Sequence, residues 1–171
     1  MEMTRRVDIF QRSKALTKSF ELNIDKWKTM DAEILDFVSS GWQNIKYLND
    51  EGTDLNTEIA AVPNDCGGVY LFLLKPDLIP PLHRYIMYIG RARRKENYGL
   101  RQRCRTYIND ERPLVADMID QWGKDLYLYF LPINKEDEFI DRVERELLRV
   151  IIPPCNTDIP DHYTMPPTRM F

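Results

Sequence analysis

The sequence predicts an α/β protein of the α+β type, in which a three-stranded antiparallel sheet is flanked by helices and preceded by a helical N-terminal extension. Three observations support this fold class. Apolar runs at 69–74 and 85–89 are separated by a polar, proline-containing connection, which is typical of an antiparallel hairpin. A third run at 126–131 adds a strand. Apolar residues at helical spacing recur before and after these strands, and 43% hydrophobic residues suffice for one core.

Residues 1–61 form the predicted helical extension. Met30, Ile34, Phe37 and Val38 recur at helical spacing, Asp31 stands near the start of that segment, and Ser39 to Gly41 ends it. The extension carries eight Lys or Arg against eleven Asp or Glu, so it is not a basic arm. We expect a packing layer or a contact with a second copy or another protein; a role in substrate choice is the alternative.

The predicted hairpin places two tyrosines near one end of the sheet. Its first strand has apolar residues on both faces, as expected for a central, covered strand. Tyr70 lies near the start of this strand, and Tyr88 lies near the end of the second, which Gly90 stops. Antiparallel pairing predicts that the two phenols face each other.

A dense cluster of positive charge follows the hairpin. Residues 91–105 contain seven cations opposed only by Glu96, within a chain of net charge −3 and pI near 5.5. These cations are Arg91, Arg93, Arg94, Lys95, Arg101, Arg103 and Arg105. Binding of nucleic acid by bulk charge is therefore excluded, and only this local cluster suits it. Alone, such a run is usually a solvated face; interleaving with Tyr98 and Tyr107 favours phosphate contacts.

Further helices are predicted downstream, and the last one carries a carboxylate among its apolar residues. Leu100, Cys104, Tyr107 and Ile108 give a short helix one buried stripe, and a second helix runs from Pro113 to Trp122. Pro132 is expected to end the third strand, and the last helix spans roughly 136–152. On that helix Glu144 falls in the apolar arc of Ile140, Val143 and Leu147. A carboxylate there needs a metal ion or a salt bridge.

Five short elements, in order, resemble the GIY-YIG nuclease family. They are Gly68-Val69-Tyr70, Tyr88-Ile89-Gly90, Leu100-Arg101-Gln102-Arg103, Glu144 and Asn156. The resemblance covers residues 62–157, which implies a nuclease domain there and a C-terminal tail at 158–171. It implies a DNA endonuclease in which Glu144 binds Mg²⁺, with Mn²⁺ as a substitute, and in which Gly68, Gly90 and Asn156 support the site.

The resemblance also assigns roles to the other residues. Tyr70 would take or relay the proton of the attacking water, Tyr88 would orient water or phosphate, and Arg103 would bind the scissile phosphate. Because a phenol with a pKa near 10 is a poor base, a nearby cation such as Arg91 would have to favour phenolate. The interval from Gly90 to Arg103 is longer than is usual in the family, so Arg101 is the alternative phosphate ligand. The predicted DNA contacts are Arg91, Arg93, Arg94, Lys95, Arg101, Arg105 and Tyr107.

Two other function classes stay open. A catalytically silent nucleic-acid-binding module would keep the fold, and a structural interaction protein would use Glu144 in a salt bridge. The sequence shows no membrane span or signal peptide, which predicts a cytoplasmic protein, associated with a nucleoid or nucleus in the case of DNA binding. Cys66, Cys104 and Cys155 are expected to be reduced thiols, Cys104 in the core. Specific duplex sites, damaged strands and branched junctions are all open as substrates.

Overall fold

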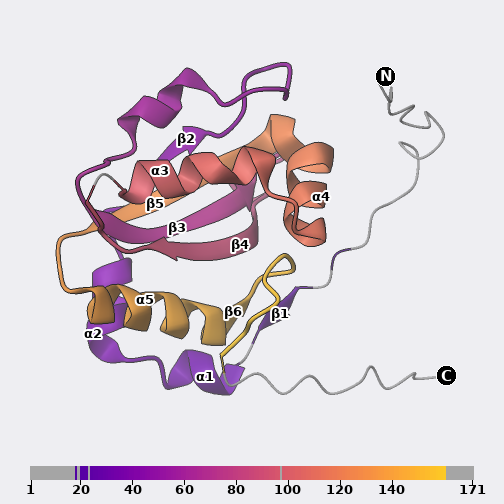
Figure 1. Cartoon of the computed structure of the whole chain (residues 1–171). Coiled ribbons are helices and arrows are strands. Elements are labelled where there is room, and N and C mark those ends of the chain that lie inside the picture. The colour runs from indigo at the N-terminus through magenta and orange to yellow at the C-terminus, as the bar shows by residue number, and fades with distance from the viewer. Residues whose placement is uncertain (1–17, 19, 23, 97, 161–171) are drawn as a thin grey trace, which may run out of the picture.

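The computed structural model describes residues 18, 20–22, 24–96 and 98–160, and it confirms a mixed α/β fold with an antiparallel sheet (Figure 1). The main sheet has four strands rather than the predicted three. Their order is β2 (Gln43–Lys46), β5 (Leu126–Ile133), β3 (Gly67–Leu74) and β4 (Tyr85–Ala92). The sequence missed β2 because only Ile45 of its four residues is buried, which gives no alternating pattern. A separate pair joins β1 (Glu21–Leu22) to β6 (Ile151–Ile152).

The N-terminal extension is helical only in part. Helices α1 (Ile24–Lys28) and α2 (Ala32–Val38) are present, and the Asp31 carboxylate accepts the Glu33 backbone N–H at 2.9 Å, which caps α2 as expected. Residues 43–61 instead form β2, a loop and a 3-10 turn at Thr57–Ala61. Residues 1–17 of the predicted extension and 161–171 of the predicted tail lie outside the described residues.

Helices cover both faces of the sheet, as the apolar faces of β3 predict (Figure 1). Tyr70 and Phe72 face a core shared with α3 (Leu100–Arg105) and α4 (Pro113–Trp122). Val69 and Leu71 face a second core with α2 and α5 (Asp137–Val150). Strand β4 is one of the two outer strands of the sheet, so one of its edges has no neighbouring strand.

The register of the hairpin differs from the prediction. Tyr70 lies opposite Gly90, and Tyr88 lies opposite Phe72, with an irregularity after Phe72. The prediction that the two tyrosines lie directly opposite each other is therefore wrong, because the register is offset by two residues. Because the side-chain period of a strand is two, both phenols still face the α3 layer.

Three predicted ends of elements are also corrected. Gly90 lies inside β4, and Pro132 lies inside β5 opposite Gly68. The pairing of β5 with β2 stops at Phe130, so Pro132 has a neighbouring strand on one side only, where proline is tolerated. The last helix ends at Val150, because Ile151 and Ile152 pair with β1.

Other expectations hold. The presence of the two hairpin strands and the span of α4 agree with the prediction, and the buried stripe of α3 contains Leu100 and Cys104. The three cysteines are free and Cys104 is in the core, as predicted; Cys66 and Cys155 are buried as well. No helix among the described residues combines the length and apolar character needed to cross a bilayer.

Candidate active site at the outer edge of strand β4

A pocket of about 600 Å³ lies along β4 and gathers the four side chains predicted to be catalytic. They come from four elements: Tyr70 from β3, Tyr88 from β4, Arg103 from α3 and Glu144 from α5. The remaining lining comprises Gly90, Arg91, Ala92, Arg93, Lys95, Glu96 and Tyr98. The sequence thus predicted a set of residues that the fold brings to one place.

Gly90 lets the Tyr70 side chain cross β4. A Cβ atom at residue 90 would lie 2.7 Å from Cζ and Oη of Tyr70, so the ring occupies the space that a side chain would fill. The Tyr70 hydroxyl passes over the strand and lies 3.4 Å from the carbonyl oxygen of Arg91. The glycine is therefore required by the close approach of the ring, which brings the phenol to the wall of the pocket while the Tyr70 side chain itself stays fully buried.

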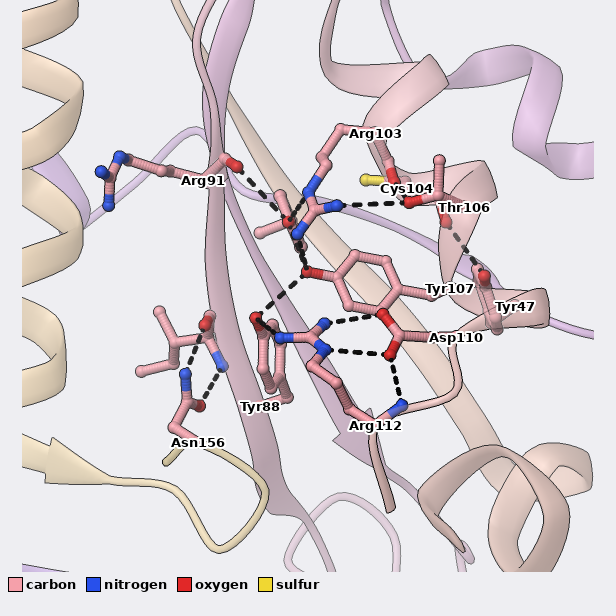
Figure 2. Close-up of polar contacts among 12 residues, drawn as sticks. Tyr47, Tyr88, Arg91, Arg103, Cys104, Thr106, Tyr107, Asp110, Arg112 and Asn156 are labelled. Carbon is pink, nitrogen blue, oxygen red and sulfur yellow. Dashed lines mark hydrogen bonds and ion pairs between the residues drawn. The ribbon is translucent and has the colours of Figure 1, made fainter. Parts of the chain in front are cut away.

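The hydroxyls of Tyr70, Tyr88 and Tyr107 form a connected cluster on the α3 side of β4, and Figure 2 labels Tyr88 and Tyr107. The hydroxyl of Tyr107 lies 2.7 Å from that of Tyr70 and donates to that of Tyr88 at 3.2 Å. The Arg103 guanidinium donates to Tyr70 at 3.2 Å and to Tyr107 at 3.1 Å. Tyr107 was expected to contact DNA, but it is only 1% exposed and instead joins the two predicted tyrosines.

Burial determines the charge state of these phenols. Desolvation raises the pKa of Tyr70 well above its ordinary value, and the neighbouring Tyr107 adds to the effect, while the positive charge of Arg103 opposes it. Desolvation likewise raises the pKa of Tyr107. Both side chains are therefore neutral phenols near pH 7, so the cations of the cluster do not by themselves produce the phenolate that a simple general base would need.

The structure distinguishes the two candidate phosphate ligands on α3. Arg103 lies at the pocket with its guanidinium against Tyr70 and Tyr107. Arg101 points elsewhere, where its guanidinium donates to the backbone carbonyls of Val62 and Ala60 at 2.6 and 2.7 Å. The helix periodicity explains this difference, because residues two apart lie on opposite sides of a helix. Arg103 is therefore the better candidate.

A second guanidinium belongs to the cluster and was missed by the sequence. Arg112 donates to the Tyr88 hydroxyl at 3.4 Å, and its guanidinium carbon lies 5.6 Å from the centre of the Tyr107 ring. Asp110 holds this guanidinium from behind with both carboxylate oxygens, at 2.9 and 2.7 Å. Figure 2 shows Arg103 and Arg112 on either side of the Tyr107 hydroxyl. The one sequence signal was an Asp and an Arg two residues apart between Tyr107 and Pro113.

On the other side of β4 the pocket is bounded by an ion-pair network. Arg91 pairs with Glu144 and, at 2.7 Å, with Asp141, which lies one turn earlier on α5. Arg93 binds the two oxygens of Asp141, and this hydrogen bonding, joined by the charge of Arg91, lowers the pKa of Asp141. The Glu144 side chain is only 13% exposed, as expected from its place in the apolar arc of the helix, and its carboxylate is paired with Arg91.

The donor set at Glu144 suits a hard cation that retains most of its water. Mg²⁺ in proteins is commonly bound by one or two carboxylates, with substrate phosphate oxygens and water completing its shell. Glu144 lines the same pocket as Tyr70 and Arg103 but on the other side of β4, and its carboxylate is paired with Arg91, which a cation would have to displace. Among the described residues there is no group of three or more His, Cys, Asp or Glu side chains, so a closed all-protein cage is not built here.

Two further residues named by the resemblance hold the strands that carry the tyrosines. The side-chain amide of Asn156 accepts the Ile89 N–H at 2.9 Å and donates to the Ile89 carbonyl at 2.8 Å, so it caps the outer edge of β4 next to Tyr88. Gly68 allows β3 to approach β5: a Cβ there would lie 2.3 Å from the Leu131 carbonyl oxygen. Both residues therefore support the positions of Tyr70 and Tyr88.

Of the predicted DNA contacts, Tyr107 is buried and the Arg101 guanidinium is held by backbone carbonyls, and the other five fall into two groups. Arg94, Lys95 and Arg105 are exposed, and Arg94 and Lys95 line a neighbouring pocket of about 820 Å³. Arg91 and Arg93 are held by carboxylates of α5, which reduces the charge they offer to a phosphate. The positive cluster that the sequence shows is therefore partly neutralised by residues far along the chain.

Comparison of the chain with protein-family models, with curated proteins and with solved structures gives no match.

Proposed function

We propose that this protein is a Mg²⁺-dependent DNA endonuclease with a site of the GIY-YIG type, formed by residues 62–157. The observation that carries the proposal is the convergence of Tyr70, Tyr88, Arg103 and Glu144, from four separate elements, on one pocket. Hydrolysis of a phosphodiester needs a proton acceptor for the attacking water, a cation against the phosphate and stabilisation of the developing negative charge in one place, and these four side chains could supply them.

Each side chain has a role that its surroundings support. Arg103 presents guanidinium N–H groups beside the Tyr70 hydroxyl and binds the scissile phosphate. Tyr70 receives the proton of the attacking water, and Tyr88 orients the phosphate. A Mg²⁺ ion held by Glu144 would supply stabilisation of the negative charge that develops on the phosphate oxygens.

The direct test is cleavage by the purified protein. Supercoiled plasmid, nicked DNA and branched DNA are incubated with Mg²⁺, with Mn²⁺ or with chelator. Cleavage is expected only with metal, and Tyr70→Phe should lower the rate by ~10²-fold or more while DNA binding persists, because only the proton-transferring hydroxyl is removed. Wild-type protein that cuts none of these substrates refutes the proposal.

The alternative is a catalytically silent nucleic-acid-binding module, and one observation favours it: Arg91 occupies the carboxylate of Glu144. Glu144→Gln separates the two functions. We expect this change to alter the free energy of unfolding by less than ~1 kcal/mol, because Arg91 is 37% exposed and keeps Asp141. It should abolish cleavage and any Mg²⁺-dependent rise in melting temperature. Unchanged cleavage would remove Glu144 from the site.

A partner and a location follow from the same proposal. Trp27 on α1 and Leu35 on α2 are 56% and 52% exposed, and these apolar side chains support a contact of the N-terminal helices with a second copy or another protein. An enzyme of this class acts where its DNA is, in the cytoplasm at the nucleoid or in the nucleus. Gel filtration with light scattering, for wild type and for Trp27→Ser, tests the contact.

A further inference from the structure

The geometry points to a directed proton relay through Tyr70, Tyr107 and Tyr88, whose direction is set by the ion pair of Asp110 and Arg112. This inference rests on the proposed endonuclease and adds the route by which the proton of the attacking water reaches the leaving oxygen. It gives Asp110 and Arg112, which no motif of the sequence singled out, a role as positioning residues.

The hydroxyl of Tyr88 has only one direction left for its proton. A phenol oxygen has one O–H group to donate and two positions that accept. Tyr88 accepts from the Tyr107 hydroxyl at 3.2 Å and from Nη1 of Arg112 at 3.4 Å. Both accepting positions are thereby used, so the Tyr88 proton is available to an oxygen atom in the pocket that this residue lines.

Counting donors and acceptors in the same way gives the direction of the hydrogen bonds made by the Tyr107 and Tyr70 hydroxyls. Because Tyr107 donates to Tyr88, the 2.7 Å bond between Tyr107 and Tyr70 must be donated by Tyr70. Tyr107 also accepts from Nη2 of Arg103, which fills its second position. Tyr70 accepts from Nε of Arg103 and retains one accepting position. Its other acceptor, the Arg91 carbonyl, is more distant at 3.4 Å.

The row of three hydroxyls therefore accepts a proton at Tyr70 and releases one at Tyr88. As water attacks phosphorus, its proton passes to Tyr70, the Tyr70 proton passes to Tyr107, and the Tyr107 proton passes to Tyr88. The Tyr88 proton passes to the leaving oxygen, which takes the electron pair of the breaking P–O bond. Water and phosphodiester become phosphomonoester and alcohol, and the three phenols end neutral with their hydroxyls reversed. Rotation of the hydroxyls resets the chain.

The dimensions suit this step. The two bonds of 2.7 and 3.2 Å place the outer oxygens, on Tyr70 and Tyr88, at most about 6 Å apart. Two hydrogen bonds of ordinary length can therefore reach the entering and leaving oxygens of one phosphate. No phenolate forms at any stage, in agreement with the raised pKa of the buried Tyr70 and Tyr107.

Asp110 and Arg112 keep the relay pointing in this direction. The Arg112 fork is fixed by both Asp110 oxygens, and Asp110 also accepts the backbone N–H of Arg112 at 3.0 Å. Bonding to Arg112 lowers the pKa of Asp110, so the carboxylate stays charged. Without the Arg112 guanidinium the second accepting position of the Tyr88 oxygen is empty. The Tyr88 hydroxyl can then rotate and donate to Tyr107, which reverses the direction of the hydrogen bonds in the relay.

The test is single-turnover cleavage of the DNA substrate that wild type cuts, measured against pH and in mixtures of H₂O and D₂O. Wild-type protein is compared with Arg112→Met, with the milder Asp110→Asn, and with Arg84→Met as a control that removes an exposed arginine outside the site and outside the predicted DNA contacts. Dissociation constants for DNA are measured in parallel. Melting temperatures show which variants are folded.

We expect a wild-type rate that is flat between about pH 6 and pH 9 and a curved dependence on D₂O fraction, because several protons move together. Arg112→Met and Asp110→Asn should lose about tenfold or more in rate, with unchanged DNA affinity and a linear D₂O dependence.

A wild-type rate that rises about tenfold per pH unit across this range overturns the relay and leaves the endonuclease intact, since it indicates ionisation of a single base. Weaker DNA binding with an unchanged rate in Arg112→Met overturns it too, because Arg112 would then be a phosphate contact. Wild-type protein that cleaves no DNA overturns both proposals. The pH and D₂O measurements on wild type need no variant, so a substitution that prevents folding does not block the test.

Discussion

Gly90→Ala should damage the site through one methyl group. The added carbon would lie 2.7 Å from Cζ and Oη of Tyr70 and 2.8 Å from Cε2, whereas carbon contacts ordinarily lie near 3.5–4.0 Å, so the ring must retreat by about 1 Å. Tyr70 is fully buried, with Phe72 and Tyr107 packed against its ring at centroid distances of 6.4 and 5.7 Å. Overpacking of this kind costs about 1–3 kcal/mol.

The same displacement should lower the cleavage rate. A shift of about 1 Å stretches the 2.7 Å contact between the Tyr70 and Tyr107 hydroxyls beyond hydrogen-bonding distance, and misplacement on that scale reduces rates by about 10²-fold. Urea unfolding and single-turnover cleavage measure the two effects. In a Tyr70→Leu background the far ring atoms are gone, so Gly90→Ala should cost much less stability. A Gly90→Ala protein with wild-type stability and rate would refute this account of the glycine.

Two other predictions concern the pH dependence of stability and the salt dependence of DNA binding. Burial raises the pKa of Tyr47, Tyr70 and Tyr107 in the native state. Above about pH 10 the unfolded state therefore loses phenol protons that the native state keeps. The free energy of unfolding should be unaffected by these phenols below that pH and should fall above it by up to ~1.4 kcal/mol per pH unit for each phenol. Urea unfolding at increasing pH measures this loss, and a flat profile would contradict it. For DNA binding, Arg94→Ala should lower the slope of log K against log salt by up to ~0.9 for each phosphate that is no longer neutralised, whereas Arg93→Ala should change it less because Asp141 already holds Arg93. Equal effects of the two substitutions would argue against the role of that ion pair.

Local patterns in the sequence predicted much of the fold. The hairpin of β3 and β4, the span of α4 and the cap of α2 by Asp31 depend on apolar periodicity and on signals next to the element itself. Strand β2 lacks such a signal, because its residues are mostly polar and its identity as a strand comes from pairing with β5. The register of the hairpin was missed because the long loop between its strands does not fix it.

For the site, the sequence predicted the residues but not how they are paired. Arg91 and Glu144 are 53 residues apart, and Arg93 and Asp141 are 48 apart, so their ion pairs follow only from the docking of α5 beside β4. Tyr107 was predicted both in the buried stripe of the helix and among the DNA contacts; its burial is confirmed, and that burial is at odds with a DNA contact. Arg112 was missed because its contact is with Tyr88, 24 residues earlier in the chain, and depends on how the segment between α3 and α4 packs against β4.

The bond between Asn156 and Ile89 has a consequence for the timing of assembly during protein synthesis. A growing chain that already contains Tyr70, Tyr88 and Arg103 has an open outer edge on β4, because the amide that closes it lies 67 residues beyond Ile89. Glu144 also arrives late, and closing so long a loop is slow compared with forming the hairpin. The strand that carries Tyr88 is therefore secured only after residue 156 has been synthesised, so that a chain shorter than this lacks the assembled candidate site.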